Sequence, residues 1–329
     1  MAEGRVRWGV LSAAKIAREW VAPGIHMSDR GELAAVASLT PGKAEALAAP
    51  YGRVRLHRSY EALLADPEVD AVYIPLPNHQ HVEWTAKCLE AGKHVLCEKP
   101  IALRAAEIDG LIALRDRTGL VAAEAFMVTH HPQWVRAREL VREGAIGRLR
   151  QVQGAFSFFN DDPGNIRNRA DMGGGALRDI GVYPSISARF VSGEEPVSVP
   201  WAAIEWEGGI DATARVVAEF PSFAMDFYVS MRMAPRQIMT FHGDKGWLSV
   251  HAPYNAGAYG DPVIEIRNAE ATVVLERFPR SDHYRAQIDA FNASVLDGAD
   301  YACPLEFSRG NQVMIDMIYD AAGGEGSSG

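Results

Sequence analysis

Short apolar segments alternate with amphipathic segments along the first 126 residues. Apolar runs typical of buried strands occur at residues 5–11, 32–39, 70–76, 93–97 and 120–126. Helical patterns fill most of the intervals, and the pattern that starts near Ala14 is interrupted near Pro23. Near-continuous apolar strands separated by helices predict a parallel sheet covered on both faces. Residues 1–125 are therefore expected to form an α/β, doubly wound domain of the Rossmann type, with ligands at the carboxyl ends of its strands.

The pattern changes after Gly147, where period-2 segments are joined by turn residues. Strands are predicted at residues 148–159, 212–220, 224–233, 236–243, 246–250 and 262–267. Helices are predicted at about 176–191 and as a pair within 282–321. Residues 126–322 are thus expected to form an α+β domain with a large, mostly antiparallel open sheet. On that sheet Phe227, Val229 and Met231 are expected to lie on an open apolar face, which favours a homodimer or homotetramer.

Composition narrows the possible partners. Of 329 residues, 48% are hydrophobic and 23% charged, and the formal net charge is −9. An acidic chain repels nucleic acid and anionic membrane, so neither is expected as a partner. No apolar run approaches the roughly 18 residues of a membrane span, and the first ten residues lack a signal-peptide pattern. Three cysteines without paired spacing are typical of reduced thiols in a cytoplasmic protein. Residues 323–329 are expected to be a disordered tail.

The loop after the first strand has no glycine where a dinucleotide-binding fingerprint usually has three. The motif alone favours an ordinary strand–turn–helix. Small side chains still allow close backbone approach to a pyrophosphate, and a helix start attracts anions. The candidate residues for such a contact are Ser12, Ala13, Ala14, Lys15 and Ile16.

The end of the second strand bears on the choice of dinucleotide. Enzymes that bind NAD usually carry an acid there for the ribose hydroxyls. This chain has no carboxylate at residues 38–43, whereas Ser38, Thr40 and Lys43 offer groups that can bind a 2′-phosphate. The pattern favours NADP, with NAD as the other cofactor; alternatively, the same residues serve only as turn and N-cap residues.

The strand at 93–97 is followed at once by Glu98, Lys99 and Pro100. Two opposite charges and a residue without a backbone N–H end a strand. Most such sequences are exposed polar turns, so their meaning depends on the neighbouring segments.

Those neighbouring segments resemble the Gfo/Idh/MocA oxidoreductases along most of the chain. Residues 74–102 are similar to the fourth and fifth strands of that family with the intervening helix, and 124–133 to the start of its second domain. Residues 165–185 resemble its glycine-rich helix start. A D-x-x-x-Y pattern at Asp179 and Tyr183 is similar to the branch that contains NADP-dependent D-xylose dehydrogenase, dimeric dihydrodiol dehydrogenase and glucose–fructose oxidoreductase.

The resemblance implies that Lys99 faces the nicotinamide and the substrate. Glu98 would contact cofactor ribose or hold Lys99, and Pro100 would fix the turn, with a cis Lys99–Pro100 peptide bond as one form of it. Asp179 and Tyr183 are four residues apart and would share one face of a helix. Without the resemblance, a solvated aspartate and a half-buried tyrosine are the simpler interpretation.

The implied reaction moves a hydride between nicotinamide and the carbinol carbon of a sugar, polyol or cyclic alcohol. Tyr183 would move the hydroxyl proton. A free tyrosine has a pKa of about 10, and a nearby lysine cation can lower such a pKa by one or more units. Lys99 and Tyr183 therefore make chemical sense as a pair that meets at one bound carbinol. Asp179 would bind substrate hydroxyls or orient the pair, and no metal is required.

Further positions follow from the resemblance. Pro75, Asn78 and His79 lie at the end of the fourth strand and Glu124 at the end of the sixth, where the family contacts the cofactor. Arg167 lies on a loop that can reach the cofactor, or is a surface arginine. Tyr284 lines the substrate pocket or packs a helix. The branch commonly reads E-A-F-M-Y-R-F-H-P, and residues 128–130 differ from it, so the substrate is not fixed.

Two other activities fit such a family. One is a redox glycosidase that retains its NAD, which would not release reduced cofactor in bulk. The other is a non-catalytic cofactor-binding sensor, which would be expected to have lost the lysine or the tyrosine. Both residues are present in this chain, which favours an enzyme.

Overall fold

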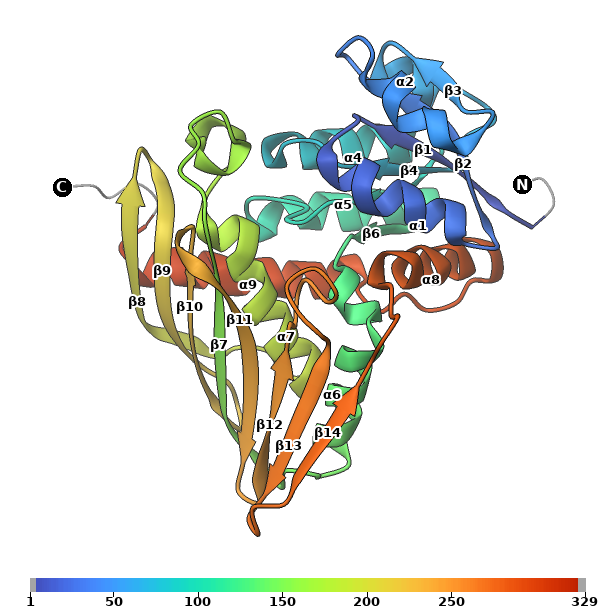
Figure 1. Ribbon diagram of the computed structural model, residues 1–329. Helices are drawn as coiled ribbons and strands as arrows, with labels where there is room; N and C mark the ends of the chain where they lie inside the picture. Colours follow the sequence, from blue (N-terminus) through green and yellow to red (C-terminus); the bar gives the residue numbers. More distant parts are fainter. Residues whose placement is uncertain (1–3, 325–329) are drawn as a thin grey trace. The chain divides into compact units, whose positions relative to one another are not determined.

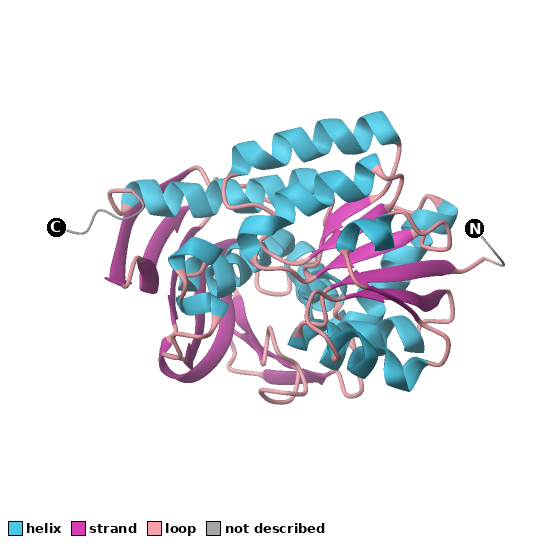
Figure 2. Ribbon diagram, turned by 90° about the horizontal axis from the view of Figure 1, so that it is seen from above, coloured by secondary structure: helices cyan, strands magenta, loops and turns pink. Residues whose placement is uncertain are grey.

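In a computed structural model that describes residues 4–324, the alternating N-terminal half forms a parallel sheet. Within the described residues this sheet has six strands in the order β3-β2-β1-β4-β5-β6, the doubly wound order of dinucleotide-binding domains. The strands are β1 (Val6–Leu11), β2 (Gly31–Ala37), β3 (Arg55–His57), β4 (Ala71–Ile74), β5 (His94–Cys97) and β6 (Ala122–Glu124). Helices cover both faces of this sheet (Figure 2).

The helices around this sheet begin with a π-helical turn before Pro23. The missing N–H of a proline breaks the α-helical ladder, and the wider turn η1 accommodates it. The segments are η1 (Ala17–Val21), α1 (Ala22–Met27), α2 (Lys43–Ala48), η2 (Ala49–Tyr51), α3 (Tyr60–Leu64), η3 (Asn78–Gln80), α4 (His81–Glu90), α5 (Ala105–Thr118), η4 (Met127–His130) and α8 (His283–Asp297).

The second sheet has eight strands within the described residues, in the order β14-β13-β12-β11-β7-β10-β9-β8 (Figure 1). Only β10 and β7 pair in parallel; the other neighbours are antiparallel. The strands are β7 (Leu149–Phe159), β8 (Ser198–Glu207), β9 (Ile210–Glu219), β10 (Ala224–Ser230), β11 (Arg232–Gly243), β12 (Gly246–His251), β13 (Val263–Asn268) and β14 (Val273–Arg277). The predicted fold class, a Rossmann sheet plus a mostly antiparallel sheet, is confirmed.

One face of the second sheet is covered by helices. The helical segments of this part of the chain are α6 (Pro132–Arg142), η5 (Ile166–Asn168), η6 (Ala170–Met172), η7 (Leu177–Gly181), α7 (Val182–Ser192) and α9 (Leu305–Ala321). Phe227, Val229 and Met231 are at most 3% exposed, so the prediction that they line an open face is wrong. Their period-2 spacing does place them on one face, but that face is the covered one. The opposite face of β10 carries Asp226 and Tyr228.

Several elements were not predicted from the sequence. β3 has three residues, of which none is buried. The edge strands β8 and β14 also contain no buried residue. Strands without a buried face show no apolar alternation, which is the signal that sequence analysis depends on. The helices α3 and α6 were missed as well.

The chain divides into two compact units. The first comprises the described parts of Met1–His130 and Asp282–Arg309, and the second those of His131–Ser281 and Gly310–Gly329. This division differs from the predicted domains, because α8 packs with the first unit. The buried indole of Trp8 donates to Asn292 Oδ1 at 3.0 Å, and its ring lies 5.0 Å from that of Phe291. A helix that returns from a distant part of the sequence leaves no local signal of its partner.

The end of the chain and the lengths of the helices complete the fold. Gly323 and Gly324 follow α9 in a turn, and residues 325–329 of the predicted disordered tail lie outside the described residues. Among residues 4–324, no helix combines the length and the apolar character needed to cross a bilayer.

Candidate functional site

The turn after β1 has the backbone that a dinucleotide loop needs. Ser12 has a φ of 84°, in the left-handed region that usually favours glycine, and its N–H donates to the carbonyl of Ala37 at 2.8 Å. Ala13 is buried, while Lys15 is 79% exposed and lies 3.7 Å from Glu19. The small residues therefore build the turn that the missing glycines would otherwise provide.

The turn after β2 confirms the local role of its serine. Ser38 Oγ accepts from the N–H of Thr40 at 3.2 Å and donates to the carbonyl of Thr40 at 3.1 Å. Gly42 has a φ of 78°, and Lys43 then begins α2. The turn interpretation is thus satisfied, and a 2′-phosphate contact stays a prediction.

The segment after β4 begins with a buried Pro75 and leads into η3, which contains Asn78 and His79. His79 is exposed, and its Nε2 lies 3.2 Å from Nε2 of Gln80. His81 is the first residue of α4, and it is completely buried, which the sequence did not indicate.

The segment after β5 is not the exposed polar turn that its residue types suggest. The Lys99–Pro100 peptide bond is cis, which confirms that expectation. Pro100 is buried, and Glu98 and Lys99 are half-buried. Oε1 of Glu98 accepts from the hydroxyl of Tyr73 at 2.6 Å. Burial raises the pKa of Tyr73 well above its ordinary value, and the negative charge of Glu98 raises it further.

Glu124 ends β6 and is 3% exposed. Its Oε1 accepts from the N–H of Ile101 at 2.8 Å, and Ser308 donates a further hydrogen bond to the carboxyl group. Burial raises the pKa of Glu124 to about 7, and the two hydrogen bonds oppose that shift. The structure therefore assigns the carboxylate to protein partners, and its predicted cofactor contact is untested.

Tyr284 lies at the start of α8 and is 7% exposed. Its ring stacks on that of Trp20 with the centroids 5.5 Å apart, and burial raises the pKa of its phenol. Tyr284 thus packs its helix against η1, as one of the two alternatives predicted, while a substrate contact stays a prediction.

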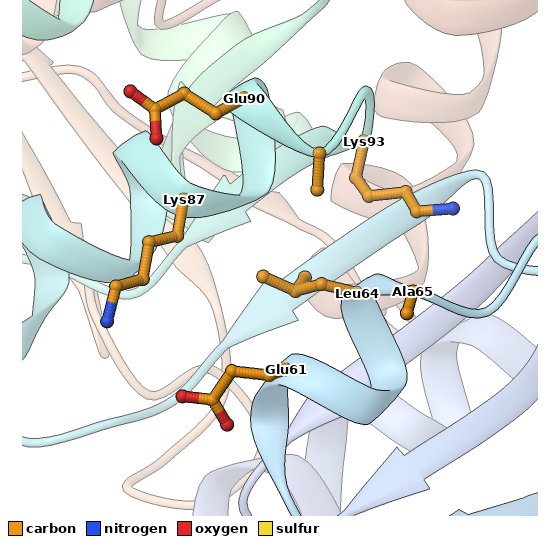
Figure 3. Close-up of a pocket in the computed structure, with 7 residues that line it drawn as sticks. Glu61, Leu64, Ala65, Lys87, Glu90 and Lys93 are labelled. Carbon is orange, nitrogen blue, oxygen red and sulfur yellow. The ribbon is translucent and has the colours of Figure 1, made fainter.

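A hollow lies at the opposite, amino-terminal edge of the parallel sheet, between α3 and α4 (Figure 3). Lys93, which precedes β5, is 8% exposed there and donates to the carbonyls of Asp66 and Val69 at 2.8 and 2.7 Å. Its role is thus structural. The lining residues are Glu61, Leu64, Ala65, Lys87, Glu90, Ala91 and Lys93.

In the second unit, Asp179 and Tyr183 lie on one continuous helical segment, Asp179 in η7 and Tyr183 in α7. Arg167 Nε donates to Asp179 Oδ2 at 2.6 Å, so the loop arginine holds the aspartate. Tyr183 is 7% exposed, and its ring centroid lies 5.6 Å from that of Phe156 and 5.1 Å from that of Tyr254. The tyrosine is thus set in an aromatic environment.

The start of this segment is fixed by a residue that sequence analysis missed. Asp211 on β9 is 1% exposed, accepts from the N–H of Leu177 at 2.5 Å and from the hydroxyl of Tyr319 at 2.9 Å. Burial raises the pKa of Asp211 to about 6. Gly175 has a φ of 126°, and a Cβ there would overlap the Asp211 carboxylate. A buried acid on a strand, 34 residues away in sequence from Leu177, gives no local signal.

Each unit, taken by itself, presents groups with a distinct chemical capacity. The first presents loops at the carboxyl edge of a parallel sheet, where dinucleotides bind. The second presents an aspartate and a phenol on an anchored helix, which are groups that bind hydroxyls and move protons.

Comparison with known proteins gives matches over both parts of the chain. Residues 6–126 match the oxidoreductase family with an NAD-binding Rossmann fold, and residues 134–249 match the Gfo/Idh/MocA C-terminal domain. An uncharacterized oxidoreductase of Rhizobium meliloti is 40% identical over 96% of this chain and 97% of its own. D-xylose 1-dehydrogenase (NADP⁺) 2 of Haloferax volcanii is 34% identical over 96% of this chain and 97% of its own.

A solved structure is similar over nearly the whole length. KijD10, a 3-ketoreductase from Actinomadura kijaniata in complex with NADP and TDP-benzene, has a TM-score of 0.89 and 30% identity. The match covers 96% of this chain and 98% of that one.

Proposed function

Because the chain belongs to the Gfo/Idh/MocA family of oxidoreductases, we propose that it is an NAD(P)-dependent dehydrogenase or reductase that prefers NADP. Family membership confirms the resemblance that residues 74–102 and 165–185 carry. The proposed substrate is the carbinol, or the corresponding carbonyl, of a sugar, polyol or cyclic alcohol. A relative named as a D-xylose dehydrogenase and a neighbour named as a 3-ketoreductase support this substrate class.

The cofactor preference is supported by the first unit. The turn at Ser12 and the small side chains at Ala13 and Ala14 fit a backbone cradle for a pyrophosphate. The turn after β2 has no carboxylate that would repel a 2′-phosphate, and Lys43 supplies a positive charge. NADP in the names of the xylose dehydrogenase and of the 3-ketoreductase complex points the same way.

In the proposed reaction, the nicotinamide supplies or accepts the hydride when bound. Tyr183 moves the proton at the carbinol oxygen. Because a free tyrosine has a pKa of about 10, a phenolate near neutral pH needs a cation close to it. We assign that task to the ammonium of Lys99, which also attracts the oxygen of the substrate. Positioned proton transfer of this kind is worth about 10²–10⁴-fold in rate.

Asp179 is proposed to accept hydrogen bonds from substrate hydroxyls. Its 2.6 Å contact with Arg167 favours the ionised carboxylate, which is the acceptor form. Arg167 is thus proposed to act through Asp179, and a cofactor contact by Arg167 is the finer prediction. Tyr284 and its stacking partner Trp20 are proposed to border the same substrate.

One observation carries the proposal. The lysine of the E-K-P turn follows β5 at the ligand-binding edge of the sheet, in a partly buried turn whose Glu98 is hydrogen-bonded to Tyr73. An ammonium held there meets the chemical need of the reaction.

The proposal is tested with a matched pair of substitutions at the two ends of β5. Lys99→Met should lower kcat at least about 10²–10³-fold, as removal of one preorganised charge does, and leave the affinity for NADP within about threefold. Lys93→Met is the control, because it removes a buried ammonium that donates to two backbone carbonyls at the opposite edge of the sheet. It should lower stability by about 1–3 kcal/mol and leave kcat unchanged.

The assay follows the absorbance of reduced nicotinamide with NAD⁺ and NADP⁺ in parallel over aldoses, inositols and dihydrodiols. Equal turnover of Lys99→Met and the unsubstituted protein would rule out the assigned role. Turnover of glycosides without bulk release of reduced cofactor would favour the redox glycosidase, and binding without any turnover would favour the sensor.

We further propose a cytoplasmic homo-oligomer that pairs through the open face of the second sheet, with neither nucleic acid nor membrane as a partner. Trp201 on β8 and Leu275 on β14 are 50% and 51% exposed, which supports an apolar contribution to such a contact. Light scattering of Trp201→Glu and Leu275→Glu should detect smaller assemblies.

A further inference from the structure

The loop that carries Lys99 is held at three of its positions by buried polar side chains from other elements of the first unit. The hydroxyl of Tyr73 on β4 donates to Oε1 of Glu98 at 2.6 Å. Nδ1 of His81 lies 2.7 Å from the carbonyl oxygen of Pro100. The N–H of Ile101 donates to Glu124 at 2.8 Å, so every neighbour of Lys99 in the loop is held.

The three polar side chains that hold this loop are buried. Tyr73 and His81 are 0% exposed and Glu124 is 3% exposed. A buried polar group is unfavourable unless it is hydrogen-bonded, and an apolar residue of similar volume would fill the same space without that requirement. What the polar side chains add is a fixed position for the loop backbone.

His81 also connects two loops. Its Nε2 lies 2.7 Å from the carbonyl oxygen of Leu76, in the segment between β4 and η3 that contains Pro75. Burial lowers the pKa of His81 to about 4, while the two carbonyl acceptors favour the protonated ring. The ring thus lies between the loop after β4 and the loop after β5; as a neutral imidazole it donates to one of the two carbonyls, and only the protonated ring donates to both.

We propose that Glu124 and His81 are positioning residues, which fix the backbone that follows Lys99, at Pro100 and Ile101, so that its ammonium is presented in one orientation. This inference rests on the proposed function, in which Lys99 acts on the substrate. It differs from the predicted role of Glu124, which was a contact with the cofactor.

The charge state of Glu124 depends on the titratable and polar groups that face its carboxyl group. Cys97, Glu98 and Lys99 face it from β5 and the following loop, Tyr301 faces it from the segment before α9, and Ser308 donates to it from α9. Because burial raises the pKa of Glu124 to about 7, the carboxylate becomes neutral as the pH falls through that value. A neutral carboxyl keeps an acceptor oxygen but loses the stronger, charge-assisted bond to Ile101.

The test compares Glu124→Gln, Glu124→Leu and His81→Leu, with Asp66→Asn as a buried acid that does not touch the loop. Glu124→Leu and His81→Leu should lower kcat about a hundredfold, the loss expected for a misplacement of about 1 Å, with the KM for NADP unchanged. Glu124→Gln should restore kcat to within about threefold and remove an inflection near pH 7 from the pH profile. Asp66→Asn should change neither quantity.

A second readout does not depend on turnover. The chain has six lysines, so ¹³Cε-lysine labelling gives a resolved NMR spectrum in which Lys99 is assigned by its loss in Lys99→Met. The Lys99 signal should shift or broaden in Glu124→Leu and His81→Leu, while the Lys93 signal stays in place. An unchanged Lys99 signal with unchanged kcat would overturn the inference. Absence of turnover in the unsubstituted protein would overturn only the proposed function, because the Lys99 signal can still be compared.

Discussion

The two regions that carry the candidate site are built on different principles. At the edge of the parallel sheet, five strand ends each contribute one short loop, and Ser12, Ser38, Pro75, Lys99 and Glu124 all follow or end a strand. In the second unit, one helical segment carries both Asp179 and Tyr183. A parallel sheet collects side chains by topology, whereas a single helix depends on how its first turn is anchored.

The regions also share a local device. η1 precedes Pro23 and η7 precedes Pro184, so a π-helical turn stands before a proline in both. A proline cannot donate to the preceding helical turn, and a wider turn relieves that defect. The loops of the first region are then held by buried Tyr73, His81 and Glu124, and the helix of the second by Asp211.

The largest expected effect is on the helix of the second unit. Tyr183→Phe removes the proton-moving group and keeps the ring, so kcat should fall about 10²–10⁴-fold with stability nearly unchanged. Tyr228→Phe is the matched control, because its hydroxyl accepts from Arg236 on the opposite face of the sheet, away from Tyr183. Similar kcat values for the two variants would remove Tyr183 from the mechanism.

The anchoring of that helix is tested by a glycine pair. Gly175→Ala should lower the free energy of unfolding by about 3 kcal/mol and reduce activity, because its Cβ would overlap the Asp211 carboxylate at a φ of 126°. Gly193→Ala also has a positive φ, 73°, but no atom lies within 4 Å of its Cβ, so about 1 kcal/mol is expected. Urea unfolding measures both. Equal losses would show that the Asp211 contact is unimportant.

The free energy of unfolding should depend on pH through Glu124, which holds the loop after β5. The native pKa of Glu124 is raised from 4.5 to about 7, so the native state binds the proton more tightly than the unfolded chain does. Stability from this group is present at low pH and is lost as the pH rises from about 4.5 through 7. Between pH 5 and pH 8 the loss should be about 2–3 kcal/mol, and Glu124→Gln should lack it.

Asp66 provides the contrasting case, tested by Asp66→Asn. The pKa of Asp66 is lowered by hydrogen bonds from the Glu68 N–H, Arg55 and His57, which outweigh the effect of burial. The carboxylate therefore stabilises the fold above its ordinary pKa, and that contribution is lost as the pH falls. Denaturant midpoints are measured at several pH values for the unsubstituted protein, Glu124→Gln and Asp66→Asn. The differences between each variant and the unsubstituted protein should change with pH in opposite directions. Parallel trends would contradict the assigned environment of Glu124.

The smallest expected effect concerns cofactor choice. Ser38→Asp places a carboxylate at the end of β2 and should shift the NADP-to-NAD preference about tenfold, or about 1.4 kcal/mol, toward NAD. Ser59→Asp is the control, because Ser59 is the N-cap of α3, where aspartate is also favourable. An unchanged preference in Ser38→Asp would count against the placement of the 2′-phosphate near that turn.

The sequence predicted the first region better than the second, for physical reasons. Buried parallel strands are continuous apolar runs, so their ends could be located and the residues that follow them named. The tie between Arg167 and Asp179 and the cap from Asp211 join residues 12 and 34 positions apart, and periodicity contains no information on such pairs. The same limit explains Phe227, where alternation fixed the shared face but not which face is covered.

The central claim is that Lys99 and Tyr183 act on the same carbinol, and a double-mutant cycle tests it most directly. kcat is measured for the unsubstituted protein, Lys99→Met, Tyr183→Phe and the double variant with one substrate. If the cation stabilises the phenolate, the double variant should be about as slow as the slower single variant, because residues that work as a unit are not additive. A loss equal to the product of the two single losses would show that they act independently and would contradict the mechanism.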